Sequence, residues 1–240
     1  MANDNIRPLV IVGTGEIALI AREYFEHDSI YTPVAFAIGD GYAKADMLDG
    51  LPLLPIEEIK DRFPPQKCSA FVAIGDTHLN RLRTRYYKFM KSEGYELATY
   101  VSSHCFKWHN VEVGDNCLIL ENNVLQPFVK IGNNVILWSG NHIGHRSEVK
   151  DNVFITSHVV VSGLCKVGEF TYIGVNASVA HNVEISADNF IAMSTAIGSS
   201  TAPDTIHQGN PSEVRKVSAT RFCRVPGHYL VKAEPSAPLT

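Results

Sequence analysis

Aliphatic residues recur at every sixth position through a long central stretch of this chain. From Val113 to Ile197, fifteen consecutive positions spaced six residues apart all hold Val, Ile or Leu. The position two residues before each aliphatic is mostly small or β-branched, as at Cys117, Val135 and Ala177, and glycine follows several of the aliphatics. A period of six fits neither an amphipathic helix nor a simple alternating strand.

Short fixed repeats of this kind are typical of β-solenoids. In such a fold we expect each aliphatic to point into the interior and the small residue before it to let the chain turn a corner. Three hexads then complete one triangular coil of eighteen residues. Cys117 and Cys165 fall in the small-residue phase and are therefore predicted to be buried packing residues.

The first hundred residues follow a different pattern, with short continuous apolar runs at 9–12, 34–38 and 70–74. Runs of this composition are typical of buried parallel strands. A helical pattern follows the first run, a second begins at 55–59, and a longer one covers 79–93. The pattern predicts a small β-α-β domain whose loops lie at the carboxyl ends of its strands.

The first of these runs ends in a G-x-G-x-x-A turn at residues 13–18. Such a turn brings backbone amides and a helix N-terminus close to a phosphate. One alternative is a nicotinamide dehydrogenase in which Asp40 holds a ribose hydroxyl, but the domain is too short for a second mononucleotide-binding half. Another is that the glycines only let the helix pack on the sheet. Arg81, Arg83 and Arg85 are candidates for phosphate contacts, with a solvated helix face as the alternative.

Composition excludes several classes of protein. The net charge of −4 over 240 residues provides no basic footprint for nucleic acid. The N-terminus has no signal-peptide pattern, and no apolar run reaches the roughly 20 residues needed to span a bilayer, so we expect a cytoplasmic protein. The five cysteines are scattered without a C-x-x-C pair, which argues against a disulfide framework or a zinc site.

A short β-α-β domain followed directly by a hexapeptide solenoid resembles the PglD/NeuD-type hexapeptide-repeat sugar acyltransferases, here over residues 8–216. The resemblance implies an α/β Rossmann-like N-terminal domain followed by a left-handed parallel β-helix. It divides the chain into a nucleotide-sugar-binding domain (1–103), a β-helix acyltransferase domain (104–216) and a C-terminal tail (217–240).

The same resemblance implies that the N-terminal domain holds the nucleotide of a nucleotide-linked sugar. Carried over by position, Gly13 and Gly15 approach the diphosphate, while Asp40, Gly75 and Asp76 line the base and ribose. It also implies a homotrimer with active sites between subunits. The outward-facing Trp108, Phe128 and Trp138 would suit such an interface or the substrate cleft.

The catalytic segment of the family aligns with residues 143–150, which places His145 at the position of the general base. An acyl transfer to an amine needs the amine without its proton, and a neutral imidazole can accept that proton near pH 7. One coil above His145 is Gly163, a candidate oxyanion donor through its backbone N–H. The orienting acid of the family is replaced by Arg146, which leaves Glu148 as a possible substitute.

Two further positions bear on the base. The second histidine of the family is Phe154 here, and His142, three residues before His145, is the alternative base. The remaining hypothesis is that His142 and His145 both have structural or substrate-binding roles. His158 and His181 are predicted to be solvent-exposed histidines at the edge of the site. His181 also lies on the face where the coenzyme tail would run.

The segment 209–215 resembles the G-N-P-A-[KR] sequence that ends many hexapeptide acetyltransferases. The resemblance places Asn210 and Arg215, with Lys216 beside them, near the nucleotide of coenzyme A. Metal binding by the histidines is rejected, because no paired spacing or carboxylate supports it.

These features together predict an acetyl-CoA-dependent N-acetyltransferase that acts on the amino group of a nucleotide-linked deoxy amino sugar, for bacterial surface glycan synthesis. The amine would attack the thioester directly, since no cysteine occupies the catalytic coil. The alternatives are a sugar O-acetyltransferase of the sialic-acid type and a non-catalytic solenoid that binds a nucleotide sugar.

Overall fold

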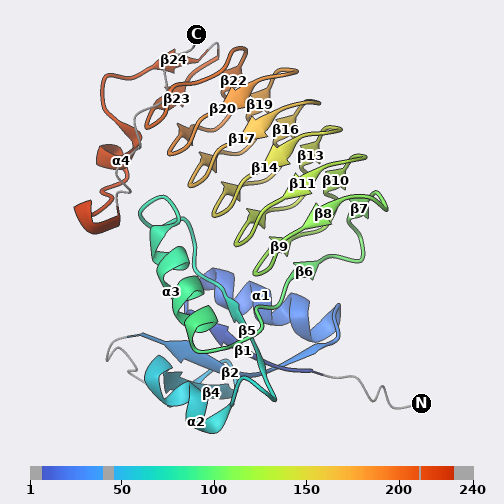
Figure 1. The fold of residues 1–240 in the computed structure, drawn as a ribbon, viewed down its shortest axis with the longest axis vertical. Coiled ribbons are helices and arrows are strands. Elements are labelled where there is room, and N and C mark those ends of the chain that lie inside the picture. Colours follow the sequence, from blue (N-terminus) through green and yellow to red (C-terminus); the bar gives the residue numbers. More distant parts are fainter. Residues whose placement is uncertain (1–6, 40–45, 211, 230–240) are drawn as a thin grey trace.

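The structure is a computed structural model that describes residues 7–39, 46–210 and 212–229. It consists of an α/β domain and a triangular β-helix stacked on it (Figure 1). This confirms the predicted fold class. Within the described residues, none of the helices is both long and apolar enough to cross a membrane.

The α/β domain is built on a five-stranded sheet with the strand order β3-β4-β2-β1-β5. All neighbours are parallel except β3, which pairs antiparallel with β4. The sequence analysis did not predict β3 and β4. The strands of the α/β domain are β1 (Arg7–Val12), β2 (Tyr31–Ile38), β3 (Met47–Leu48), β4 (Leu51–Pro55) and β5 (Ser69–Val72). Its helices are α1 (Glu16–His27), η1 (Ile56–Glu58), α2 (Ile59–Arg62) and α3 (Arg81–Ser92).

The β-helix has three parallel sheets, each forming one face of a prism, and every strand has two residues except β23, which has three. The first, which we call the covered face, comprises β6 (Tyr100–Val101), β9 (Leu118–Ile119), β12 (Ile136–Leu137), β15 (Phe154–Ile155), β18 (Tyr172–Ile173), β21 (Phe190–Ile191) and β23 (Ile206–Gln208), with β24 (Glu213–Val214) added antiparallel. The second, the histidine face, comprises β7 (Phe106–Lys107), β10 (Val124–Leu125), β13 (His142–Ile143), β16 (Val160–Val161), β19 (Ser178–Val179) and β22 (Ala196–Ile197). The third, the charged face, comprises β8 (Glu112–Val113), β11 (Lys130–Ile131), β14 (Glu148–Val149), β17 (Lys166–Val167) and β20 (Glu184–Ile185).

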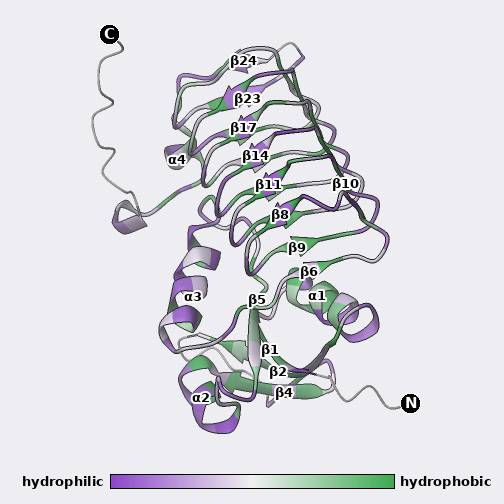
Figure 2. Ribbon diagram, turned by 45° about the vertical axis from the view of Figure 1, so that its right-hand side comes forward, coloured by the Kyte–Doolittle hydropathy of each residue, from purple (hydrophilic) through white to green (hydrophobic). Residues whose placement is uncertain are grey.

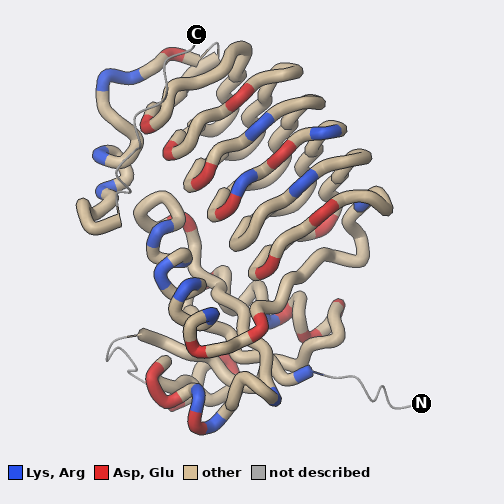
Figure 3. The backbone as a smooth tube through the Cα atoms, viewed as in Figure 1, with Lys and Arg blue, Asp and Glu red and all other residues tan. Residues whose placement is uncertain are grey.

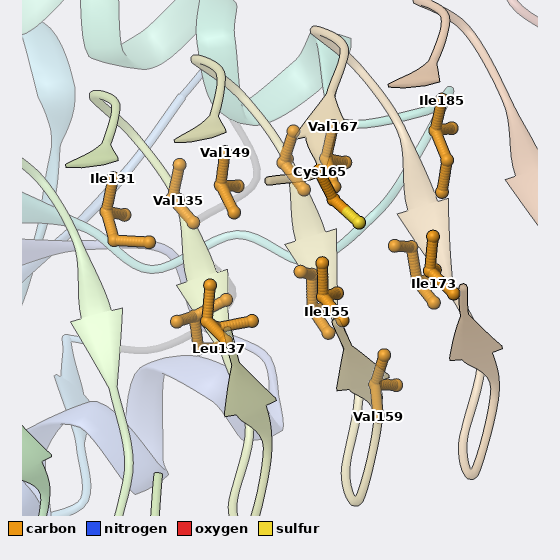
Figure 4. Close-up of a cluster of buried hydrophobic side chains, with 14 of the residues drawn as sticks. Ile131, Val135, Leu137, Val149, Ile155, Val159, Cys165, Val167, Ile173 and Ile185 are labelled. Carbon is orange, nitrogen blue, oxygen red and sulfur yellow. The ribbon is translucent and has the colours of Figure 1, made fainter. Parts of the chain in front are cut away.

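The eighteen-residue coil is confirmed by the strand register. His142 pairs with Val160, Glu148 with Lys166, and so on through the prism. The aliphatics of the six-residue phase and their small neighbours fill one continuous core (Figure 4). Cys117 and Cys165 are fully buried in that core, as predicted.

The corners of the prism are made differently from the expectation. The small residues point into the core, and the chain is turned by the residue just before each of them, which adopts a left-handed conformation. Asparagine is frequent there because it tolerates positive φ better than most residues. Examples are Asn116, Asn134, Asn152, Asn176 and Asn182, with φ between 52° and 62°.

The three faces present different side chains, because the first residue of each two-residue strand points outward. The charged face alternates in sign from coil to coil, and the covered face is apolar and aromatic. The histidine face is mixed, with Val124, His142 and Val160 in one column. The outward residues are Glu112, Lys130, Glu148, Lys166 and Glu184 on the charged face, and Leu118, Ile136, Phe154, Tyr172 and Phe190 on the covered face.

The α/β domain packs on the lower coils of the covered face. Helix α1 buries Ala18, Ala21 and Phe25, which share one side of the helix. These residues join a single buried cluster with Leu118 and Ile136 of the prism. Trp138 packs against the same cluster, so this tryptophan lies at the junction of the two parts, whereas Trp108 and Phe128 are exposed. Most residues in the strands of the sheet are hydrophobic, most clearly in β2 and β4 (Figure 2).

The C-terminal segment returns along the upper part of the covered face. Helix α4 (Ala219–Phe222) and the 3₁₀ helix η2 (Gly227–Tyr229) follow the last strand. Phe222 packs edge-on against Phe190, with 5.3 Å between ring centroids, and Cys223 and Val225 contact a cluster formed by Leu79, Ile206 and Ala219. The segment that the sequence assigned to a C-terminal tail therefore packs on the upper coils as far as residue 229, and residues 230–240 lie outside the described residues.

Candidate active site

A cavity of about 650 Å³ opens where β1, β2 and β5 end, which is where ligands bind in open α/β sheets. Gly13, Gly15 and Gly75 all line it, so three of the five predicted nucleotide contacts come together. Asp76 is exposed and is not part of the lining. The predicted ribose contact Asp40 lies outside the described residues.

The two glycines of the first turn serve different purposes. Gly13 has a φ of +132°, and a Cβ there would lie 2.5 Å from the carbonyl oxygen of Ala73. Gly13 is therefore required by its close approach to the chain that follows β5, whereas the packing alternative concerned the contact of the helix with the sheet. A Cβ on Gly15 would meet nothing within 4 Å, and Gly15 has an ordinary negative φ. The fold itself does not demand glycine at this position.

Helix α1 begins at Glu16 without a side-chain cap, so its first backbone amides are directed toward the cavity at Gly15. On the opposite side, Arg85 and Tyr86 of α3 line the same cavity. The lining thus combines a helix N-terminus, a guanidinium and an aromatic ring. A diphosphate joined to a base and a sugar fits this combination.

The other two arginines of α3 are buried against the β-helix, contrary to both readings offered from the sequence. Arg83 is fully buried and donates to the carbonyls of Ile74 and Gly75 and to the side chain and carbonyl of Asn134. Arg81 forms an ion pair with Asp188 and lies over the ring of Phe170. Figure 3 marks several basic positions along α3, and those of Arg81 and Arg83 therefore belong to the interface between the two parts of the chain.

A second group of candidate residues lies on the β-helix, at the corner between the histidine face and the charged face. His145 occupies this corner just after β13, and its side chain is exposed. A Cβ added to Gly163 would lie 2.3 Å from Cε1 of His145, so the imidazole rests directly on the glycine one coil above. The ring of His181, one coil further, is 6.0 Å away from that of His145 between centroids.

The structure explains the predicted site residues that surround His145. The guanidinium of Arg146 lies over the ring of Phe128, 4.4 Å from its centroid. The carboxylate of Glu148 accepts from Lys150 at 2.6 Å on the charged face. Phe154 opens β15 and is buried under the α/β domain. Neither Glu148 nor Phe154 thus stands in for the missing acid or the second histidine.

His142 opens β13 and points outward on the histidine face, where it is half-buried beside Val124 and Val160. His158 lies at another corner, with its exposed ring packed over Gly140. One functional candidate was missed by the sequence analysis. The side chain of Gln126, in the coil below His145, accepts a hydrogen bond from the backbone N–H of His145 at 2.8 Å.

The predicted coenzyme end lies at the top of the prism. Asn210 falls in the turn between β23 and β24, and Arg215 follows β24 with its guanidinium 3.4 Å from the side-chain oxygen of Gln208. Both side chains are exposed.

The cysteines offer no activated thiolate. All five are free, and burial raises the pKa of Cys117 to about 12 and the pKa values of Cys68, Cys105 and Cys223 to about 11. None of the five lies in the coil of His145. Among the residues that the structure describes, no three His, Cys, Asp or Glu side chains gather in a metal-binding arrangement.

Comparison with known proteins places the fold. The sequence model of the bacterial transferase hexapeptide family (six repeats) matches residues 110–145 and 128–163. A search of proteins with curated functions gives no match.

Several solved structures share the architecture over most of the chain. Perosamine N-acetyltransferase from Caulobacter crescentus, solved as a variant with CoA and GDP-perosamine, is 21% identical with a TM-score of 0.79, covering 87% of this chain and 96% of that chain. The acetyltransferase domain of PglB from Neisseria gonorrhoeae is 17% identical with a TM-score of 0.78, covering 87% and 100%. WeeI from Acinetobacter baumannii is 15% identical with a TM-score of 0.55, covering 88% and 100%. The predicted resemblance to sugar acyltransferases is confirmed in the fold.

Proposed function

We propose that this protein is an acetyl-CoA-dependent N-acetyltransferase that acts on the amino group of a nucleotide-linked deoxy amino sugar. The observation that carries the proposal is the presence of two sites on one chain: a cavity suited to a nucleoside diphosphate and an exposed histidine seated on Gly163 of the β-helix. The similar structure from Caulobacter crescentus, which holds CoA and GDP-perosamine, supports the same pairing of ligands.

The reaction needs one base and no covalent intermediate. The neutral amine nitrogen attacks the carbonyl carbon of the thioester, and His145 takes the proton that the nitrogen loses. The C–S bond breaks and coenzyme A leaves as a thiolate, which receives the proton from His145. The products are the acetamido sugar nucleotide and the free thiol of coenzyme A. The raised pKa values of the Cys105 and Cys117 thiols agree with direct attack rather than an acyl-enzyme.

We assign Gly163 as the backbone donor to the developing oxyanion, and His181, Asn210 and Arg215 as contacts of coenzyme A. His142 is the alternative base. The arrangement of the faces favours a trimer with active sites between subunits. The α/β domain covers one face of its own prism, whereas His145 lies at the opposite corner. A substrate held by one copy would then meet His145 of another.

The proposed pathway is the synthesis of bacterial surface glycans in the cytoplasm, where acetyl-CoA is made. The test is the release of free thiol from acetyl-CoA with a panel of nucleotide-linked 3-amino and 4-amino sugars, alongside the matching hydroxyl sugars. Turnover with an amino sugar supports the proposal. Turnover with a hydroxyl sugar alone indicates O-acetylation, and no turnover with any substrate indicates a binding role.

A variant pair assigns the base. Replacing His145 by Ala should lower kcat by about a hundredfold or more, the range that a general base contributes. The same change at His142 should have a much smaller effect. A larger loss for His142→Ala than for His145→Ala would move the base to His142.

A further inference from the structure

The replacement of the orienting acid by Arg146 leaves open what holds the imidazole of His145 in a productive state. A general base must present a lone pair, and in a neutral imidazole only one of the two nitrogens has it. Which nitrogen carries the proton is set by the hydrogen bond that the other groups offer to it. A residue that fixes this choice would replace the family's acid.

Gln126 is placed to do so. It follows β10 in the coil below, and its Oε1 lies 2.8 Å from the backbone nitrogen of His145 and 3.4 Å from Nδ1 of the same residue. The backbone N–H is a donor under all conditions, so the amide atom that faces it must be the oxygen. An oxygen that also faces Nδ1 can only accept, which requires the proton on Nδ1.

The other charged and titratable groups around the ring do not compete for Nδ1. The guanidinium of Arg146 lies over Phe128, and Glu148 is paired with Lys150. The ring of His181 is inclined by 42° to that of His145, with 6.0 Å between the ring centroids. Gly163 presents its bare backbone to the imidazole from the coil above.

We propose that Gln126 is the positioning residue of the catalytic histidine: its side-chain oxygen holds the proton on Nδ1 and leaves Nε2 of His145 free to accept the proton of the attacking amine. The inference rests on the proposed function for its catalytic meaning. A neutral amide differs from the carboxylate of the family because it fixes the tautomer without a negative charge that would favour the imidazolium.

The first test does not depend on activity. Histidine labelled with ¹⁵N in the full-length protein reports the tautomer of each ring by NMR, and the signal of His145 is assigned from its absence in His145→Asn. We expect the Nδ1–H form in the native protein and a shift toward Nε2–H in Gln126→Ala. An Nε2–H tautomer in the native protein overturns the proposal, whatever the substrate proves to be.

The second test uses turnover with an amino sugar. Gln126→Ala should lower kcat by about ten- to a hundredfold, as seen for groups that orient a functional histidine, with the KM values of both substrates nearly unchanged. Gln126→Glu keeps both acceptor contacts and should retain most of the activity. Its carboxylate should move the acidic limb of the kcat/KM profile to higher pH, because a nearby negative charge raises the pKa of an imidazole.

The matched control separates this role from a structural one. The side chain of Asn133 also caps a backbone N–H across coils, that of Asp115 at 3.0 Å, but at a different corner of the prism. Asn133→Ala should leave the His145 tautomer and the pH profile unchanged. If Gln126→Glu leaves the acidic limb where it is, or Asn133→Ala lowers kcat as Gln126→Ala does, the positioning role is wrong. The absence of turnover in the native protein would instead contradict the proposed function alone.

Discussion

At the residue scale, the glycine turn of the α/β domain divides into a structural position and a ligand position. Gly13 combines a positive φ with a backbone oxygen 2.5 Å from where a Cβ would be. Gly15 has room for a side chain, and that room is the cavity. The two glycines of the G-x-G-x-x-A turn are thus present for two different physical reasons.

This division predicts opposite results for two single substitutions. Gly15→Ala should fold with a free energy of unfolding within about 1 kcal/mol of the native value, since only the N-cap preference of α1 is disturbed. Its methyl group should weaken the binding of a nucleoside diphosphate by about tenfold or more, which is about 1.4 kcal/mol. Gly13→Ala should lower the free energy of unfolding by about 2 kcal/mol or more, because strain and a steric overlap add.

Urea unfolding and calorimetric titration with UDP, GDP and dTDP measure both effects. Equal nucleotide affinity in Gly15→Ala and the native protein would remove Gly15 from the site and leave the turn a packing device.

Among the candidate site residues on the β-helix, only those related by the eighteen-residue coil could be predicted to lie together. Counting by eighteen from His145 arrives at Gly163 and His181, and the structure brings those three together. Gln126 is offset from that column by one residue, so the same count misses it. The register of Val124 with His142 does place Gln126 beside the corner that bears His145, and that register follows from the coil length. The direction of the Gln126 side chain does not follow from the coil length.

At the element scale, α3 is the part that joins the two halves of the chain. It runs along one corner of the prism, where Arg83 and Thr84 bond to Asn134 and Asn152. Burying a guanidinium is costly unless its donors are satisfied, and burial lowers the pKa of Arg83 to about 9. The six acceptor contacts of Arg83 offset this cost, since they leave the charge bonded on every side.

Removing that guanidinium should therefore destabilise the protein severely. Arg83→Met removes the donor to the carbonyls of Ile74, Gly75 and Asn134, and we expect a loss of about 3 kcal/mol or more in the free energy of unfolding. The matched control is Arg85→Met, on the same helix but exposed at the cavity. It should change stability by less than about 1 kcal/mol and weaken nucleotide binding instead.

Chemical denaturation and nucleotide titration of both variants test this contrast. A stability loss of the same size in both variants would mean that the network around Arg83 contributes little beyond general packing on α3.

The orientation of α3 could not be predicted from its sequence, because a helix with basic residues on several sides does not indicate which side is buried. That choice depends on the asparagine corners of a second domain. The corners themselves could have been predicted from the sequence. Asparagine recurs in one phase of the hexad, and its tolerance of left-handed backbone gives that recurrence a physical reason.

A second contact between elements predicts a pH dependence. Asp28 at the end of α1 accepts from the Ser103 backbone N–H at 2.9 Å and the Tyr100 hydroxyl at 2.7 Å, both at the start of the β-helix. These hydrogen bonds hold the pKa of Asp28 below its ordinary value. A carboxyl with a depressed folded pKa stabilises the folded state above its unfolded pKa, and this contribution is lost as pH falls through the folded pKa.

Asp28→Asn should accordingly lower the free energy of unfolding at pH 7 by at most about 1 kcal/mol, because Asp28 is partly exposed to solvent. The difference from the native protein should shrink as the pH is lowered below about 4. Thermal unfolding measured from pH 7 to pH 3 follows the two curves, and a difference that stays constant across this range would contradict the assignment.

At the scale of the whole molecule, the three faces of the prism differ in what covers them and in their charge. The covered face is buried under α1, α3 and the C-terminal segment. The charged face alternates Glu and Lys and forms ion pairs along its own column, as between Lys130 and Glu112 at 3.3 Å. The histidine face is neither covered nor charged, and Val160 on it is 45% exposed. The proposed trimer therefore has one suitable surface, beside the corner that bears His145.

A charge placed on that surface should separate the copies. Val160→Lys puts an ammonium group where we expect an apolar contact, and an unpaired charge in an interface costs several kcal/mol. Light scattering should then report a mass near that of a single 26.5 kDa chain. Acetyl transfer should fall with it, because His145 and the cavity would no longer meet across copies, while nucleotide binding should persist because the cavity lies within one chain. Lys166→Gln on the charged face is the control and should leave mass and turnover unchanged. A Val160→Lys protein that keeps the native mass and full turnover would show that the copies meet elsewhere or that one chain suffices.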